Sequence, residues 1–216
     1  MSRPFLDAAA RHPIILADGS PHAGTVHLNQ VIDHPNISIG DYSYYSGFDT
    51  PADYAAALAP YLYPGAPERL AIGRFCQIAH GVRIITSSAN HAMDGFSTYP
   101  FAVFNPELIG AYAASIGNSR DTVIGNDVWL GFESVVMPGV RIGNGAIIAA
   151  RAVVAGDVPD YAVVAGNPGR VIRRRFADDV VERLLAAAWW DWDLERIARH
   201  AEAITGADIE ALERGA

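Results

Sequence analysis

The sequence predicts a mainly β protein built as a parallel β-helix, and three observations support this fold class. Aliphatic residues recur every six positions from Ile124 to Val154, glycine or alanine follows most of them, and a second run with the same spacing starts at Ile72. A period of six matches neither an α-helix nor a simple strand alternation. It is typical of a hexapeptide-repeat solenoid, in which three short strands per coil each turn one apolar side chain inward.

The longer run defines the inner face of the expected prism. Its aliphatic members are Ile124, Leu130, Val136, Ile142, Ile148 and Val154, and small or β-branched residues stand four places after each of them. One coil cannot bury its own interior, so successive coils stack at the ordinary strand spacing of about 4.8 Å. We therefore expect Ile142 to point into the prism, while Arg141 and Asn144 point away from it.

The shorter run consists of Ile72, Ile78 and Ile84, with Ile39 as an isolated earlier member. It is out of phase with the longer run, and a 37-residue stretch from Thr86 to Thr122 separates the two. Such a stretch is long for a plain connection, and long loops on a regular scaffold are often functional. We expect residues 1–169 to form one β-helical domain that includes a protruding loop over residues 86–122.

The C-terminal part has a different pattern, and residues 170–216 are expected to form a small helical segment. Residues 170–176 leave the repeat, Asp178 is a candidate cap for a first helix, and a second helix is expected to start at Asp193. A short third helix is expected near Ile209. The cluster Trp189-Trp190-Asp191-Trp192 is expected to pack this extension onto the prism, because aromatic side chains bury large areas.

Composition and charge limit the function classes. Of the 216 residues, 50% are hydrophobic and 19% are charged, so the chain can bury a sizeable core. The net charge of −8 disfavours a nucleic-acid partner, and no window has the apolar length of a membrane span. The single cysteine, Cys76, excludes an intramolecular disulfide, and no signal-peptide pattern is visible. We therefore expect a cytoplasmic protein.

Eight short motifs follow one another along the chain. They are residues 41–45, 72–76, 89–95, 97–101, 124–129, 137–140, 166–168 and 189–192, with the sequences DYSYY, IGRFC, ANHAMDG, STYPF, IGNDVW, MPGV, GNP and WWDW. Together they resemble the xenobiotic acetyltransferase family, which includes hexapeptide-type chloramphenicol and streptogramin acetyltransferases. The motif around His91 is closer to the streptogramin branch.

This resemblance implies both an architecture and a reaction. It implies a left-handed β-helix, a homotrimer with active sites between subunits, and an active-site loop at residues 86–122. It also implies an acetyl-CoA-dependent O-acetyltransferase, in which acetyl-CoA is the cosubstrate, no metal takes part, and a small molecule supplies the hydroxyl. A xenobiotic antibiotic, either streptogramin A or chloramphenicol, is the expected acceptor.

His91 is the expected catalytic base within this resemblance. A hydroxyl that attacks a thioester needs a proton acceptor near neutral pH, and imidazole, with an unperturbed pKa of about 6.5, suits that role. Direct transfer requires no acetyl-enzyme. Cys76 is a poor nucleophile candidate because its place in the repeat points it inward, and His80 is expected to be a polar turn residue.

Two sets of residues are expected to bind the substrates. Acceptor binding is assigned to Tyr44, Tyr45, Met93, Phe101 and Trp129, with ordinary aromatic packing as the alternative for the tyrosines and the tryptophan. Acetyl-CoA binding is assigned to Gly131, Ala149, Ala150, Arg151, Asn167, Pro168 and Arg170. Small side chains let backbone amides approach a ligand, and arginines complement its phosphates.

Three alternative functions stay open at this point. Ala92 stands where the family often has arginine, residues 102–120 match the family's loop poorly, and Gly169-Arg170 replaces a more usual alanine and lysine. These departures leave room for an endogenous sugar-like alcohol as acceptor, or for a catalytically decayed structural trimer. A zinc-dependent γ-type carbonic anhydrase is disfavoured, because no second histidine follows His91 until His200.

Overall fold

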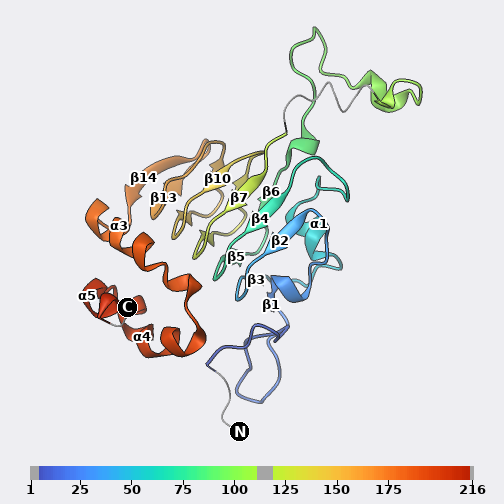
Figure 1. Ribbon diagram of the computed structural model, residues 1–216. Coiled ribbons are helices and arrows are strands. Elements are labelled where there is room, and N and C mark those ends of the chain that lie inside the picture. Colours follow the sequence, from blue (N-terminus) through green and yellow to red (C-terminus); the bar gives the residue numbers. More distant parts are fainter. Residues whose placement is uncertain (1–4, 111–118, 215–216) are drawn as a thin grey trace.

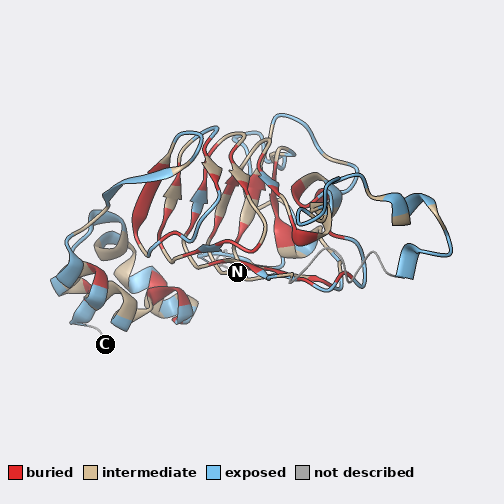
Figure 2. Ribbon diagram, turned by 90° about the horizontal axis from the view of Figure 1, so that it is seen from above, coloured by how far each residue is buried: buried red, intermediate tan, exposed pale blue. Residues whose placement is uncertain are grey.

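The computed structural model describes residues 5–110 and 119–214. Its body is a stack of short strands, with the C-terminal helices beyond one end and a long loop projecting from the other (Figure 1). Most of the strands are two or three residues long, because each strand forms only one side of a coil. The buried residues line the inside of this stack, and the exposed ones follow its outer surface and the loop (Figure 2).

Fourteen strands form three sheets within the described residues. The seven-stranded sheet has the order β1 (Thr25–His27), β3 (Tyr44–Ser46), β5 (Gln77–Ala79), β8 (Trp129–Leu130), β11 (Ile147–Ile148), β13 (Ala162–Ala165) and β14 (Arg170–Arg174). The four-stranded sheet has the order β10 (Arg141–Ile142), β7 (Thr122–Ile124), β4 (Leu70–Ile72) and β2 (Ile37–Ile39). The three-stranded sheet has the order β12 (Val153–Val154), β9 (Val135–Val136) and β6 (Arg83–Ile84).

The pairing of the strands confirms the predicted parallel coil stack. Every pair is parallel except β1 with β3 and β13 with β14, which cap the two ends of the long sheet. Ile124 lies opposite Ile142 one coil further on, after 18 residues, which is three hexapeptides. Ile72 lies opposite Ile124 in the same way, although 52 residues separate them. The two runs therefore belong to one stack, and their phase difference comes from 34 extra residues inserted into a single coil.

The inward positions are those that the period of six predicts. Ile142 is buried and the adjacent Arg141 is exposed, as expected. All six aliphatic members of the longer run are buried, and so are the residues four places after them. At the end of the stack, α1 (Tyr54–Leu58) and the 3₁₀ turn η1 (Leu28–Gln30) contribute Leu58 and Leu28 to the same core. The left-handed sense of the coil stays a prediction.

The inserted residues leave the prism between β6 and β7. They form the 3₁₀ turns η2 (Ser87–Ala89) and η3 (Phe101–Phe104) within a long irregular loop that projects outward (Figure 1). The predicted end of this loop is one residue late, because Thr122 is already the first residue of β7. Part of the stretch that matches the family poorly, residues 111–118, lies outside the described residues.

The C-terminal extension begins with a strand rather than with a helix. Residues 170–174 form β14, which leaves the repeat as expected but pairs with β13 and so continues the long sheet. The helices then follow as α3 (Asp178–Ala187), the 3₁₀ turn η4 (Trp189–Asp191), α4 (Leu194–Gly206) and α5 (Ile209–Glu213). The boundary expected after residue 169 therefore falls within the sheet.

The second helix begins beside Asp193 as predicted, whereas the predicted cap at Asp178 is wrong. The Asp193 carboxylate accepts a hydrogen bond from the Arg196 amide and caps α4. Ala177, and not Asp178, is the residue that precedes α3, and no side chain caps this end. Asp178 instead lies in the first turn, where its charge complements the helix dipole, and its carboxylate is 3.7 Å from the Arg174 guanidinium.

The tryptophan cluster fastens the extension to the prism, as predicted. Trp189, Trp190 and Trp192 are buried in a second hydrophobic cluster. The Trp189 ring lies 5.0 Å from the ring of Phe75, which belongs to a coil, and the Arg74 guanidinium donates to the Trp190 carbonyl. No helix in the described part of the chain is long and apolar enough to cross a membrane.

Candidate active site

A hollow of about 280 Å³ lies on the outer face of the long sheet. Its floor is a row of side chains from three successive coils, since Tyr44 lies opposite Gln77, and Gln77 lies opposite Trp129. The lining residues are Tyr44, Ser46, Phe48, Gln77, Ile78, Ala79, His80, Trp129 and Phe132. Strand alternation explains this row, because the inward neighbours of its members fill the core. The structure thus brings the predicted Tyr44 and Trp129 together.

Because side chains alternate along a strand, the two adjacent tyrosines lie on opposite faces of the sheet. Tyr44 faces the hollow, whereas Tyr45 points inward and is only 7% exposed. The Tyr45 ring packs edge-on against Tyr54, and its hydroxyl is 3.2 Å from His80 Nδ1. Tyr45 is therefore a core residue beside the wall of the hollow, and its assignment to acceptor binding stays a prediction.

His80 organises one wall of the hollow. Its ring is stacked on Phe132 and is also close to Phe48, with ring centroids 5.9 Å and 4.9 Å away. Its Nδ1 atom lies 3.4 Å from the Asp49 carboxylate and 3.3 Å from the Phe48 amide nitrogen. A turn position was predicted for His80, but its place in the wall of the hollow, which Trp129 also lines, was not.

The sequence contains a signal that identifies these additional residues. Tyr44, Gln77 and Trp129 each stand five places after an aliphatic residue that begins a coil, namely Ile39, Ile72 and Ile124. His80 stands eight places after Ile72, and Phe132 stands eight places after Ile124. Aligning the coils across the inserted loop therefore predicts both the row and the aromatic wall.

His91 lies on the projecting loop and is exposed. Its Nδ1 atom is 2.9 Å from the carbonyl oxygen of Thr98, across a bend of seven residues. A carbonyl oxygen can only accept, so Nδ1 carries the hydrogen and Nε2 of the neutral ring keeps its lone pair. The contact therefore orients the ring within the loop.

The loop exposes large apolar side chains. Met93 is 81% exposed and Phe101 is 66% exposed. Phe101 packs edge-on against Tyr99, and Tyr99 stacks on Phe104, so the ring cluster holds the loop in shape without covering it. An apolar patch of this kind marks a surface that contacts a ligand or another chain.

The predicted acetyl-CoA residues lie in consecutive turns at one corner of the prism. The Arg151 amide donates to the carbonyl of Phe132 in the turn above, and the Val153 amide donates to the carbonyl of Gly166 in the turn below. Residues 131, 149–151 and 167–168 are thereby stacked, and Arg170 follows after Gly169. The side chain of Arg151 is paired with Glu133 at 2.7 Å.

Gly131 is explained by the stacking of coils. A Cβ atom at this position would lie 2.7 Å from the Ile148 carbonyl oxygen and 2.8 Å from the Ala150 amide nitrogen. Both atoms belong to the next coil, so glycine permits the close passage of backbone. The role of Gly131 in acetyl-CoA binding stays a prediction, and Ala150 and Arg151 are exposed at this corner.

Two titratable groups, one buried and one partly buried, lie behind the hollow. Burial raises the pKa of the Cys76 thiol to about 11, and Cys76 points inward as predicted. Burial also raises the pKa of Asp127, although the Arg175 guanidinium, 3.5 Å from its carboxylate, acts in the opposite direction. The second carboxylate oxygen of Asp127 lies 3.3 Å from the side-chain nitrogen of Gln77, which lines the hollow.

The predicted residues thus form separate groups in one chain. Tyr44 and Trp129 line the hollow, but His91, Met93 and Phe101 do not. The acetyl-CoA residues occupy the adjoining corner, next to Phe132.

Comparison with known proteins defines the class first. A family model described as bacterial transferase hexapeptide (six repeats) matches residues 121–156, which form two coils of the stack. A structure of a hexapeptide-repeat-containing acetyltransferase from Vibrio cholerae, complexed with acetyl coenzyme A, is 25% identical with a TM-score of 0.42. The match covers 66% of this chain and 62% of that chain, so it spans less than two thirds of that structure. The chain thus contains a hexapeptide-repeat transferase region at residues 121–156.

Full-length relatives then define the family. A chloramphenicol acetyltransferase from Escherichia coli is 41% identical over 201 residues, which are 90% of this chain and 94% of that protein. A virginiamycin A acetyltransferase from Staphylococcus aureus is 43% identical over 189 residues, which are 87% of this chain and 85% of that protein. The chain belongs to the xenobiotic acetyltransferase family, and it is therefore an acetyltransferase.

Proposed function

We propose that this protein transfers the acetyl group of acetyl-CoA directly to a hydroxyl of an antibiotic, with His91 as the general base. The observation that carries this proposal is the contact between His91 Nδ1 and the Thr98 carbonyl oxygen, at 2.9 Å. It orients the imidazole and leaves Nε2 as the proton acceptor. Family membership supports acetyl transfer as the reaction class.

The proposed reaction needs one proton acceptor and no covalent enzyme intermediate. Nε2 of His91 takes the proton of the acceptor hydroxyl while its oxygen attacks the thioester carbonyl carbon. The C–S bond then breaks, and the protonated imidazole returns the proton to the thiolate that leaves. A backbone amide stabilises the negative oxygen in between. The buried Cys76 thiol, with its raised pKa, is unsuited to an alternative route through acetyl-cysteine.

The site is proposed to form between the subunits of a homotrimer. The hollow that contains Trp129 has an open mouth, and His91 is not among its lining residues. The loop that carries His91 projects away from the coils and exposes Met93 and Phe101 (Figure 1). A loop from one subunit that covers the hollow of its neighbour buries these side chains and brings the base to the acceptor.

The acceptor is proposed to be a bulky, partly apolar alcohol. Aromatic rings dominate the hollow, where Tyr44, Phe48, Trp129 and Phe132 surround the polar groups of Gln77 and His80. Pockets for such ligands are mainly apolar with a few placed polar groups, whereas a simple sugar needs many polar partners. Streptogramin A is the first candidate and chloramphenicol the second. A sugar-like alcohol is the alternative.

Acetyl-CoA is proposed to lie along the corner formed by the stacked turns. Ala149, Ala150, Arg151 and Asn167-Pro168 lie there beside the hollow, and Arg170 is exposed at the edge. Arg151 can exchange its exposed contact with Glu133 for a phosphate, because surface ion pairs are weak.

The test compares kcat/KM for streptogramin A, chloramphenicol, a galactoside and maltose, with free thiol from acetyl-CoA as the readout. His91→Ala is expected to lower kcat by about 10²-fold or more. His22→Ala is the matched control, since His22 lies outside the hollow and the loop, and it is expected to leave kcat unchanged. Preference for either sugar refutes the antibiotic acceptor, and an active His91→Ala variant refutes the base.

A further inference from the structure

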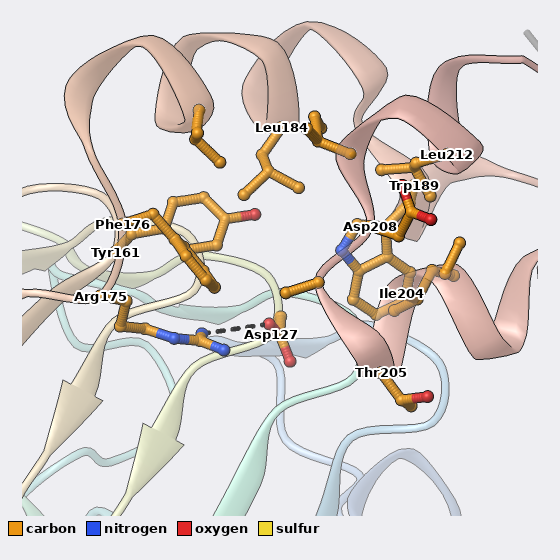
Figure 3. Close-up of a pocket in the computed structure, with 14 residues that line it drawn as sticks. Asp127, Tyr161, Arg175, Phe176, Leu184, Trp189, Ile204, Thr205, Asp208 and Leu212 are labelled. Carbon is orange, nitrogen blue, oxygen red and sulfur yellow. Dashed lines mark ion pairs between the residues drawn. The ribbon is translucent and has the colours of Figure 1, made fainter.

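A cavity outside the proposed active site lies between the C-terminal helices and the prism. It has a volume of about 390 Å³, which is within the range of small-molecule sites. Figure 3 shows that its walls come from two sides, with Arg175 and Asp127 on the prism side and Leu184, Ile204 and Leu212 on the helices. None of the residues predicted to bind acetyl-CoA or the acceptor lines it.

Most of the cavity wall is apolar. Phe176 and Leu184 form one side, and Trp189, Ile204 and Leu212 form the other (Figure 3). The ring of Tyr161 completes this wall, and it is 2% exposed. A wall of this kind favours an apolar body of roughly the size of a bicyclic aromatic ring.

One end of the cavity carries two opposite charges, and the distance between them is long for an ion pair. The Arg175 guanidinium lies 3.5 Å from the Asp127 carboxylate, which is longer than a charge-assisted hydrogen bond. The side chains remain 28% and 21% exposed, so both are accessible at the cavity floor. Arg175 also donates to the Gly145 carbonyl at 2.7 Å and lies over the rings of Tyr161 and Phe176, which fixes its position.

A fixed acceptor and a fixed donor side by side select the charge of a ligand. A carboxylate head is repelled by Asp127, and an ammonium head is repelled by Arg175. A neutral group that contains both a donor and an acceptor satisfies the two residues together, as a primary amide does when its N–H donates to Asp127 and its C=O accepts from Arg175.

We propose that this cavity is a second ligand site, which binds a small neutral molecule with an apolar aromatic body and an amide-like head. The site is distinct from the acetyl-transfer site, and its occupancy does not depend on the proposed reaction. The head group contacts Asp127 and Arg175 side by side, and the body lies between Leu184 and Trp189.

The test uses three probes that share one ring and differ in charge. Indole-3-acetamide, indole-3-acetate and tryptamine are titrated into the intact protein, and binding is followed by ligand-observed NMR. The amide is expected to bind with a Kd of about 1 mM or below, as its size allows. The acid and the amine are expected to bind at least about fivefold more weakly. Equal affinity of the three probes overturns the proposal, and so does a lack of saturable binding of the amide.

Three variants locate the binding. Ala203→Phe fills the cavity from α4 and is expected to abolish amide binding, while Arg174→Ala changes the neighbouring arginine outside the cavity and is expected to preserve it. Asp127→Asn leaves Arg175 without its anion, so it is expected to reverse the preference from the amide to the acid. If Asp127→Asn does not fold, the three-probe comparison on the unmodified protein tests the charge selectivity.

A control variant separates this cavity from the proposed acceptor hollow. Trp129→Ala alters the hollow and is expected to leave amide binding unchanged. Amide binding that survives Ala203→Phe, or that is lost in Trp129→Ala, places the ligand elsewhere and overturns the proposal. Failure of acetyl transfer with every acceptor has no bearing on this result, because the readout is binding alone.

Discussion

Replacing Ile148 with alanine tests the core of the coil stack directly. Ile148 is 0% exposed, and its strand β11 lies between β8 and β13, opposite Leu130 and Val164. The change removes three carbon atoms, each worth about 0.8 kcal/mol when buried, which is about 2.4 kcal/mol in total. The flanking coils are fixed by their backbone hydrogen bonds and close the gap only in part. The remaining cavity raises the expected loss to about 3–4 kcal/mol.

The adjacent Ile147 supplies a control with the same chemistry. Its side chain points outward from the same strand and is partly exposed, so Ile147→Ala is expected to cost about 1 kcal/mol or less. Equilibrium unfolding in urea, at fixed protein concentration and with unchanged m-values, gives both losses. Equal losses for the two variants, or a larger loss for Ile147→Ala, refute the assignment of the inner face.

Four further predictions follow from the described contacts. Ile142→Asp is expected to destabilise by several kcal/mol, because it buries an unpaired carboxylate, while Arg141→Asp is tolerated; thermal melts compare them. Alkylation of Cys76 by iodoacetamide at pH 8 is expected to be far slower in the native protein than in urea, since burial raises its pKa to about 11. Burial raises the pKa of Asp127 in the folded protein above its value in the unfolded chain. Its contribution to stability is therefore present at low pH and lost as the pH rises through the folded-state pKa. Urea midpoints measured against pH are expected to show this loss, and Asp127→Asn is expected to remove it. Light scattering is expected to give a trimer, and an active monomer contradicts a shared site that involves His91.

The backbone architecture follows from local patterning to a large extent. A repeat of six residues states which side chains point inward, and the burial of Ile142 and Ile148 confirms it. This works because each strand contributes one inward residue per turn, so that the period in sequence is the period in space. The tryptophan cluster is predictable for a similar reason, since three large aromatic side chains close together require a packed surface.

Some residues of the hollow are also predictable from the sequence. Tyr44 and Trp129 were named from the resemblance, and Gln77 follows from the same spacing once the coils are aligned. The inserted loop hid this alignment, because it changes the phase between the two runs. Strand alternation also explains why Tyr44 lines the hollow while Tyr45 is buried in the core.

Local sequence patterns specify the repeat, the inward residues, the inserted loop and the helical extension, and the motif around His91 makes it the candidate base. Which side chains meet across coils, and across the boundary between prism and helices, depends on the tertiary structure. The contact of His91 with Thr98 and the pairing of Asp127 with Arg175 are of this kind. Forty-eight residues separate Asp127 from Arg175, and no local pattern encodes their distance. That distance depends on where β14 and the helices pack, which is set by the burial of side chains from distant parts of the chain.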